Sequence, residues 1–139
     1  MGPSESDVAR AYAKTAASTV TNGPMLLVKL FDRLVQDVEL AKEYLTLGDN
    51  QRGSDAVQHA EKIVVVLRSS LQPDGFEGGR TLLALYNTLT DLLIKANLKR
   101  DIAVLDLCQQ IIAPLHDGWT RAVARELEKE RAGAQIGVA

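Results

Sequence analysis

Apolar residues recur at three- and four-residue steps in four segments of the chain, which is the spacing of one face of an α-helix. These stripes predict helices at about residues 24–47, 50–71, 79–97 and 101–131. The clearest stripe belongs to the third segment and consists of Leu82, Leu85, Tyr86, Leu89, Leu92, Leu93 and Ala96. Four amphipathic helices joined by short connections predict an all-α protein, an antiparallel four-helix bundle.

Glycine and proline mark the limits of these segments. Pro24 suits a first helical position, because its missing N–H would be unpaired there in any case. Gly48 is a natural stop, and residues 72–79 form the longest predicted loop. Pro114 lies inside the fourth segment and predicts a kink, since it removes a backbone hydrogen bond. We expect a short, mobile N-terminal helical arm at 1–20, the bundle at 21–131 and a frayed tail at 132–139.

Composition narrows the class of partner. The 139 residues carry a net charge of −2 with acids and bases interleaved, which argues against nucleic acid as a partner. A single cysteine cannot form an internal disulfide, in keeping with a reducing cytoplasm. The N-terminus has no apolar core of a secretion signal and no apolar run reaches the length of a membrane span, so we expect neither a secretion signal nor membrane insertion.

Residues that could support catalysis or hold a metal are few. The sequence has no Glu-x-x-His pair of the di-iron type, no zinc-type Cys/His spacing and no phosphate-binding glycine loop. We therefore expect no metal, no cofactor and no enzymatic activity. His59 on the second helix permits a histidine phosphotransfer domain, although a solvated histidine is the simpler interpretation. Cys108 and Trp119 fall on the fourth stripe and are expected in the core.

The apolar residues outnumber the positions that one stripe per helix requires. The additional ones are Val65, Val66, Leu83, Ile94, Val104 and Leu107. Single exposed apolar side chains are ordinary, but a continuous patch of several hundred Å² would imply a partner. An amphipathic helix laid against such a patch is the expected mode of binding.

The third helix and the residues after it resemble the flagellar export chaperone family, FliS, over about residues 12–125. The similarity lies in Leu82-Leu83-Ala84-Leu85-Tyr86, then Ala96-Asn97, Asp101, Leu115 and Trp119. Thr21-Asn22-Gly23-Pro24 and Leu30-Phe31-Asp32 are similar to two further family elements, with Gly23 in place of serine and Phe31 in place of tyrosine.

The resemblance implies a cytoplasmic bundle that binds the C-terminal segment of flagellin, keeps it unpolymerised and assists its delivery to the export gate. It also implies an arm whose tyrosine, Tyr12 here, covers part of the flagellin surface. The expected client contacts are Tyr12, Val65, Val66, Leu83, Leu85, Tyr86 and Ile94. Two other hypotheses remain open at this point, a phosphotransfer domain using His59 and a non-catalytic helical adaptor.

Overall fold

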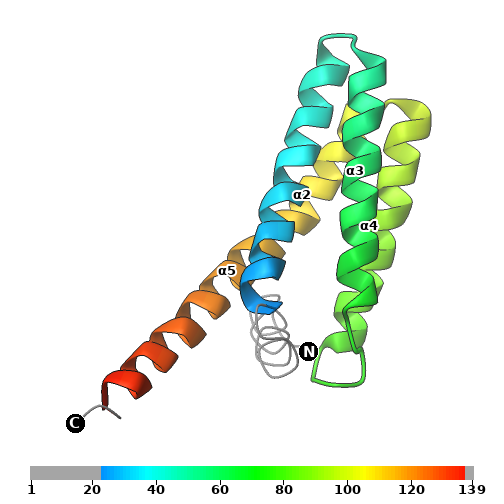
Figure 1. The fold of residues 1–139 in the computed structure, drawn as a ribbon. Helices are drawn as coiled ribbons and strands as arrows, with labels where there is room; N and C mark the ends of the chain where they lie inside the picture. Colours follow the sequence, from blue (N-terminus) through cyan, green and yellow to red (C-terminus); the bar gives the residue numbers. More distant parts are fainter. Residues whose placement is uncertain (1–22, 137–139) are drawn as a thin grey trace.

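A computed structural model describes residues 23–136 of the chain, with helices α2 (Gly23–Thr46), α3 (Asn50–Ser69), α4 (Gly79–Lys99) and α5 (Ile102–Ile136). No strand occurs in this described part. Each helix packs against two others, in the order α2, α3, α4, α5 and back to α2. The short connections make successive helices antiparallel, and the all-α four-helix bundle expected from the sequence is confirmed (Figure 1).

The helix ends follow from local chemistry. The Asp49 carboxylate accepts the backbone N–H of Arg52 at 3.1 Å and caps α3, and Asp101 accepts that of Ala103 at 2.9 Å before α5. Gly48 and Gly78 have φ of 80° and 86°, a left-handed conformation that glycine adopts readily. Gly48 lies in the short turn between α2 and α3, and Gly78 immediately precedes α4 at the end of the longer α3–α4 connection.

The core is aliphatic, with three large aromatic side chains inside it. Phe31, Tyr86 and Trp119 are almost completely buried, and the rings of Phe31 and Trp119 lie 6.2 Å apart. Cys108 is also fully buried, and burial raises the pKa of its thiol to about 12. The expected core positions of Cys108 and Trp119 are confirmed, and the cysteine stays a protonated thiol at neutral pH.

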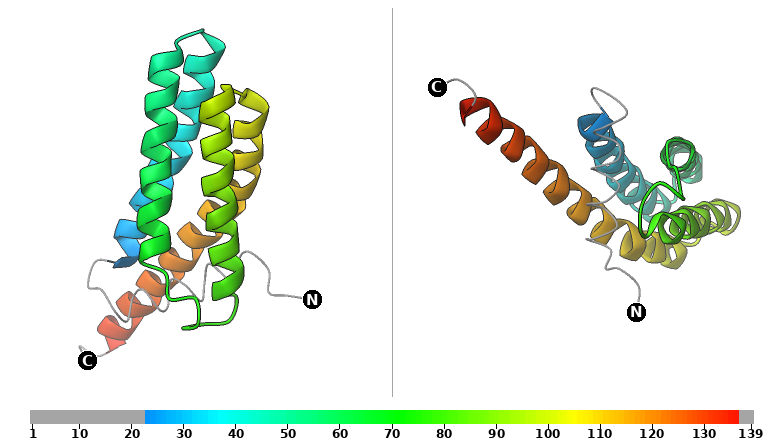
Figure 2. Two further views of the ribbon diagram at one scale, coloured as in Figure 1. Left: turned by 90° about the vertical axis from the view of Figure 1, so that its right-hand side faces the viewer. Right: turned by 90° about the horizontal axis from the view of Figure 1, so that it is seen from below.

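The last helix is longer than the sequence pattern indicated. It continues to Ile136, beyond the expected end at residue 131. Its second half, drawn in orange and red, turns away from the other helices and projects beyond them (Figure 2). Pro114 lies within this helix, where it removes one backbone hydrogen bond and favours such a change of direction. Charged residues make up half of the exposed positions described after Val123, and the others are mostly small, so this end of the helix has little to bury.

Candidate functional site

Helix α3 has two flanks that face different neighbours. Arg68 donates a hydrogen bond to Asn87 of α4 at 3.2 Å, and Val65 and Glu61 precede Arg68 by three and seven residues. That spacing places Glu61, Val65 and Arg68 on one face, the α4-facing flank. His59 contacts Asp37 of α2, and Lys62 and Val66 follow His59 by three and seven residues. His59, Lys62 and Val66 therefore form the α2-facing flank.

Apolar side chains remain open to solvent on the α4-facing side. On α4, Leu83, Asn87, Thr90 and Ile94 follow one another at four-, three- and four-residue steps, so all four lie on the face turned toward α3. Val65 is 43% exposed and Ile94 45% exposed, while Leu83 is half-buried against the core. We call Val65, Leu83 and Ile94 the α3–α4 strip. It is an apolar surface that the bundle leaves uncovered.

Polar side chains of α3 and α4 lie between and beside the apolar residues of this strip. The Arg68–Asn87 hydrogen bond crosses between the helices, and antiparallel packing then brings Glu61 to the level of Ile94. Burial raises the pKa of the Glu61 carboxyl, because its charged form is partly desolvated there. Thr90 donates its hydroxyl to the carbonyl of Tyr86 at 3.0 Å and so is satisfied within α4. Arg68 and Glu61 are thus the ionisable groups on the α4-facing flank of α3.

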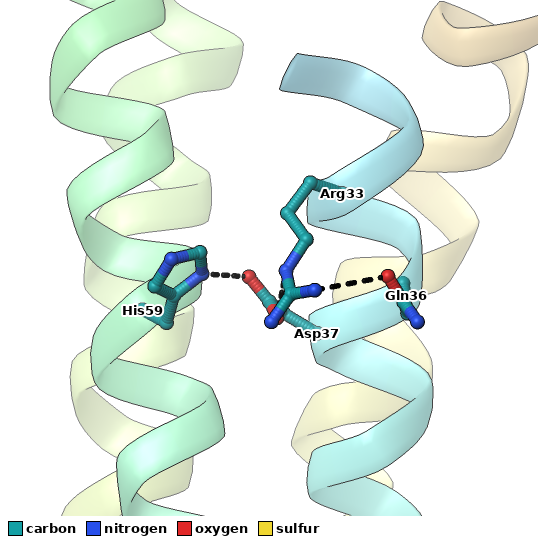
Figure 3. Close-up of polar contacts among 4 residues, drawn as sticks. All are labelled: Arg33, Gln36, Asp37 and His59. Atoms are coloured by element: carbon teal, nitrogen blue, oxygen red, sulfur yellow. Dashed lines mark hydrogen bonds and ion pairs between the residues drawn. The ribbon is translucent and has the colours of Figure 1, made fainter. Parts of the chain in front are cut away.

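The α2-facing flank is closed by charged groups instead. The Asp37 side chain is 1% exposed and contacts both Nδ1 of His59 and Nε of Arg33, the latter at 3.0 Å. Figure 3 shows the Asp37 carboxylate between these two side chains, with Gln36 accepting a further hydrogen bond from Arg33. An open hollow of about 330 Å³ lies over this cluster. A buried carboxylate with two partners ties α2 to α3.

His59 has a structural explanation in this arrangement. Its side chain is 49% exposed, in keeping with the solvated histidine expected from the sequence, and it also contacts a buried carboxylate on the neighbouring helix. His116 plays a similar part between α5 and α2, where its Nε2 lies 2.6 Å from the Asp32 carboxylate. Neither histidine needs a catalytic role to account for its position.

The seven residues expected to contact a client do not form one surface. Helical spacing places Val65, Leu83 and Ile94 on the facing sides of α3 and α4, whereas Val66, 49% exposed, lies on the α2-facing flank of α3. Leu85 is half-buried on the opposite side of the α4 stripe from Leu83, toward α5. Tyr86 is fully buried in the core, because its position coincides with the centre of that stripe. Tyr12 lies outside the described residues.

Sequence reasoning singled out His59 but missed the other polar residues that define the two flanks. Glu61, Arg68 and Asn87 could have been found from their spacing to Val65 and Leu83. Asp37 follows Leu34 by three residues and precedes Ala41 by four, so the pattern itself placed a carboxylate on a buried stripe. The partner helix that each flank faces could be identified only from the structure.

The described residues form neither a metal site nor a membrane-spanning helix. Residues 23–136 contain no group of three or more His, Cys, Asp or Glu side chains placed to hold a metal ion. Within the same part of the chain, no helix has both the length and the apolar character needed to cross a membrane.

A shallow apolar hollow of about 280 Å³ between α2 and α5 is lined by Val35, Val38, Ile112 and their neighbours.

Comparison with known proteins identifies relatives over most of the chain. The model of the flagellar protein FliS family matches residues 5–126. The flagellar secretion chaperone FliS of Bacillus subtilis (strain 168) is 25% identical over 124 residues, which cover 89% of this chain and 91% of that relative. The match includes α2, α3, α4 and the first part of α5, and therefore both flanks of α3.

Proposed function

Because the chain belongs to the flagellar protein FliS family, we propose that it is a secretion chaperone that binds the C-terminal segment of flagellin. In this proposal it acts in the cytoplasm and without catalysis. It keeps flagellin from polymerising too early and assists its delivery to the flagellar export apparatus. The observation that supports the proposal is the α3–α4 strip, an apolar surface left open beside a fully packed core.

Binding a flexible helical segment requires a large apolar surface rather than a pocket. Ordering a flexible helical segment on binding costs about 2–5 kcal/mol or more, and such segments bury about 1,000–3,000 Å². Covering the remaining exposed parts of Val65, Leu83 and Ile94 contributes roughly 1 kcal/mol for each side chain. The strip alone therefore only offsets the ordering cost. The client must continue beyond it, and Leu98, four residues after Ile94 and 80% exposed, extends the same face of α4.

A binding and polymerisation assay tests the proposal. We expect the full chain to bind a synthetic C-terminal segment of flagellin in calorimetry and to delay the seeded polymerisation of intact flagellin. Flagellin lacking that segment is the matched control and should not form the complex. If intact flagellin neither binds nor polymerises more slowly at equimolar chaperone, the chaperone proposal is wrong.

The resemblance adds two finer parts to the proposal. Tyr12 would cover part of the client surface when no flagellin is bound, and the loaded chaperone would engage the export gate. A Tyr12→Ala chain should then bind the flagellin segment faster than the unchanged chain, which stopped-flow fluorescence measures. Equal association rates would argue against a covering role for Tyr12.

A further inference from the structure

Two opposite charges stand two helical turns apart on the α4-facing flank of α3. Glu61 and Arg68 are separated by seven residues, which corresponds to about 10 Å along the helix axis. Arg68 is level with Asn87 and near the Leu83 end of the α3–α4 strip, while Glu61 is level with Ile94. The strip therefore has apolar side chains interrupted by polar ones, and on α3 it is flanked by a positive charge at one end and a negative charge at the other.

Both charges lack an ionic partner within residues 23–136. The described polar partner of Arg68 is the neutral Asn87 side chain, and no described cation lies in ion-pair range of Glu61. Asp37 on the other flank differs, since it is paired with both Arg33 and His59. The burial that raises the pKa of Glu61 adds to this contrast, because its carboxylate loses solvation without gaining a counter-charge.

We propose that Arg68 and Glu61 fix the direction in which the client lies along the α3–α4 strip. This inference rests on the proposed function, since it concerns the same surface and the same flagellin segment. The client helix presents a carboxylate to Arg68 and a basic side chain to Glu61, two turns apart on the edge of its apolar face. In the reversed direction, like charges would meet at both ends of the strip, which is strongly unfavourable once water is excluded.

The direction follows from the course of α4. This helix runs from the level of Arg68, at Asn87, to the level of Glu61, at Ile94. A client segment in which the acidic residue precedes the basic one therefore lies parallel to α4, and one with the opposite order lies antiparallel. Apolar contacts supply the affinity in either case, and the two charges select the direction.

Exchanging the two charges tests this inference with a control of the same design. The variant Glu61→Arg/Arg68→Glu leaves the net charge unchanged and inverts the asymmetry of the strip. Asp55 and Lys62 lie outside the strip, are exposed and have the same order of signs and the same seven-residue separation. The variant Asp55→Arg/Lys62→Glu is thus a matched control on the same helix.

Two measurements are made on each full-length variant with the C-terminal segment of flagellin as the probe. Calorimetry should show about tenfold weaker binding for the strip exchange and a change of less than about twofold for the control. A photoreactive group at one end of the probe should crosslink near one end of α4 in the unchanged chain and in the control. In the strip exchange this crosslinking should move to the other end of α4 or be spread over both.

The outcomes separate the inference from the proposed function. If the unchanged chain does not bind the probe, the proposed function fails. If it binds but all three proteins show equal affinity and the same crosslinks, direction-setting by Arg68 and Glu61 is overturned while the chaperone function stands. Should the exchanged chain lose its helical signal, the neutral variant Glu61→Gln/Arg68→Gln replaces it. Its crosslinks should be spread over both ends, and unchanged crosslinks would again overturn the inference.

Discussion

The two flanks of α3 meet their neighbours in opposite ways. Toward α2, the Asp37 carboxylate is 1% exposed and contacts Arg33 on its own helix and His59 on α3, so the Asp37–His59 contact joins the two helices. Toward α4, the described polar link is one exposed hydrogen bond between Arg68 and Asn87, and apolar side chains stay half-open around it. One helix thus has a flank fixed to its neighbour by a buried carboxylate and a flank whose apolar side chains stay exposed, and we propose that only the second receives a partner.

Polar contacts on the α2-facing flank should contribute far more to the free energy of unfolding than those on the α4-facing flank. Asp37→Ala removes the shared partner of Arg33 and His59, and we expect the free energy of unfolding to fall by about 1.5–3 kcal/mol. Arg68→Ala is the control on the other flank and should change it by less than about 0.5 kcal/mol. Urea denaturation of both variants measures the difference. Equal losses would mean that the flanks do not differ in the way described.

Because α2 and α3 approach each other closely at Gly53, alanine substitutions at Gly53 and at the open position Gly133 should have opposite, smaller effects on stability. A Cβ atom at Gly53 would lie 2.6 Å from Cδ2 of Leu45 on α2. Gly53→Ala should destabilise the fold by about 1 kcal/mol, the strain of overpacking less the gain in helix propensity. Gly133→Ala, where nothing lies near the added atom, should instead be stabilising by up to about 1 kcal/mol. A gain in stability from Gly53→Ala would show that the two helices have room to spare.

The smallest expected effect on stability comes from the Glu61 carboxylate on the α4-facing flank. The folded chain raises the pKa of Glu61 above its ordinary 4.5, so folding favours the protonated carboxyl and stability falls as the pH rises through that raised pKa. Glu61→Gln should therefore be slightly more stable than the unchanged chain at neutral pH, by less than about 0.5 kcal/mol. The difference should disappear once the pH is well below 4.5. Thermal melts across this range check the sign, and a less stable variant at neutral pH would contradict it.

The helices and the core could be predicted from the sequence because both depend on local spacing. The stripe that contains Leu89 and Leu93 is buried as expected, and Trp119 and Cys108 occupy the core. Helix ends were less accurate, since α3 ends at Ser69 instead of Leu71 and α5 continues to Ile136. Charged residues after Val123 suggested a loose end, yet they are compatible with an exposed helix.

The candidate site was predicted only in part. Spacing identifies apolar residues that fall off the main stripe, and it correctly separates Val65 and Ile94 from the core, but placing Val104 in the same group is wrong, because it is 5% exposed and lies in the core. It does not say which neighbouring helix a flank will face, so Val65 and Val66 looked equivalent although they lie on opposite flanks of α3. Tyr86 shows the converse problem, because the similarity to the family that drew attention to it does not distinguish a core residue from a contact residue.

We propose that the C-terminal segment of flagellin binds to the α3–α4 strip and to no other part of α3. Calorimetric titration of the flagellin C-terminal segment into Ile94→Asp and Val66→Asp chains tests it most directly, since both side chains are nearly equally exposed. We expect Ile94→Asp to weaken binding at least about hundredfold and Val66→Asp to stay within about threefold of the unchanged chain. Unimpaired binding by Ile94→Asp, or an equal loss in both variants, would contradict the account.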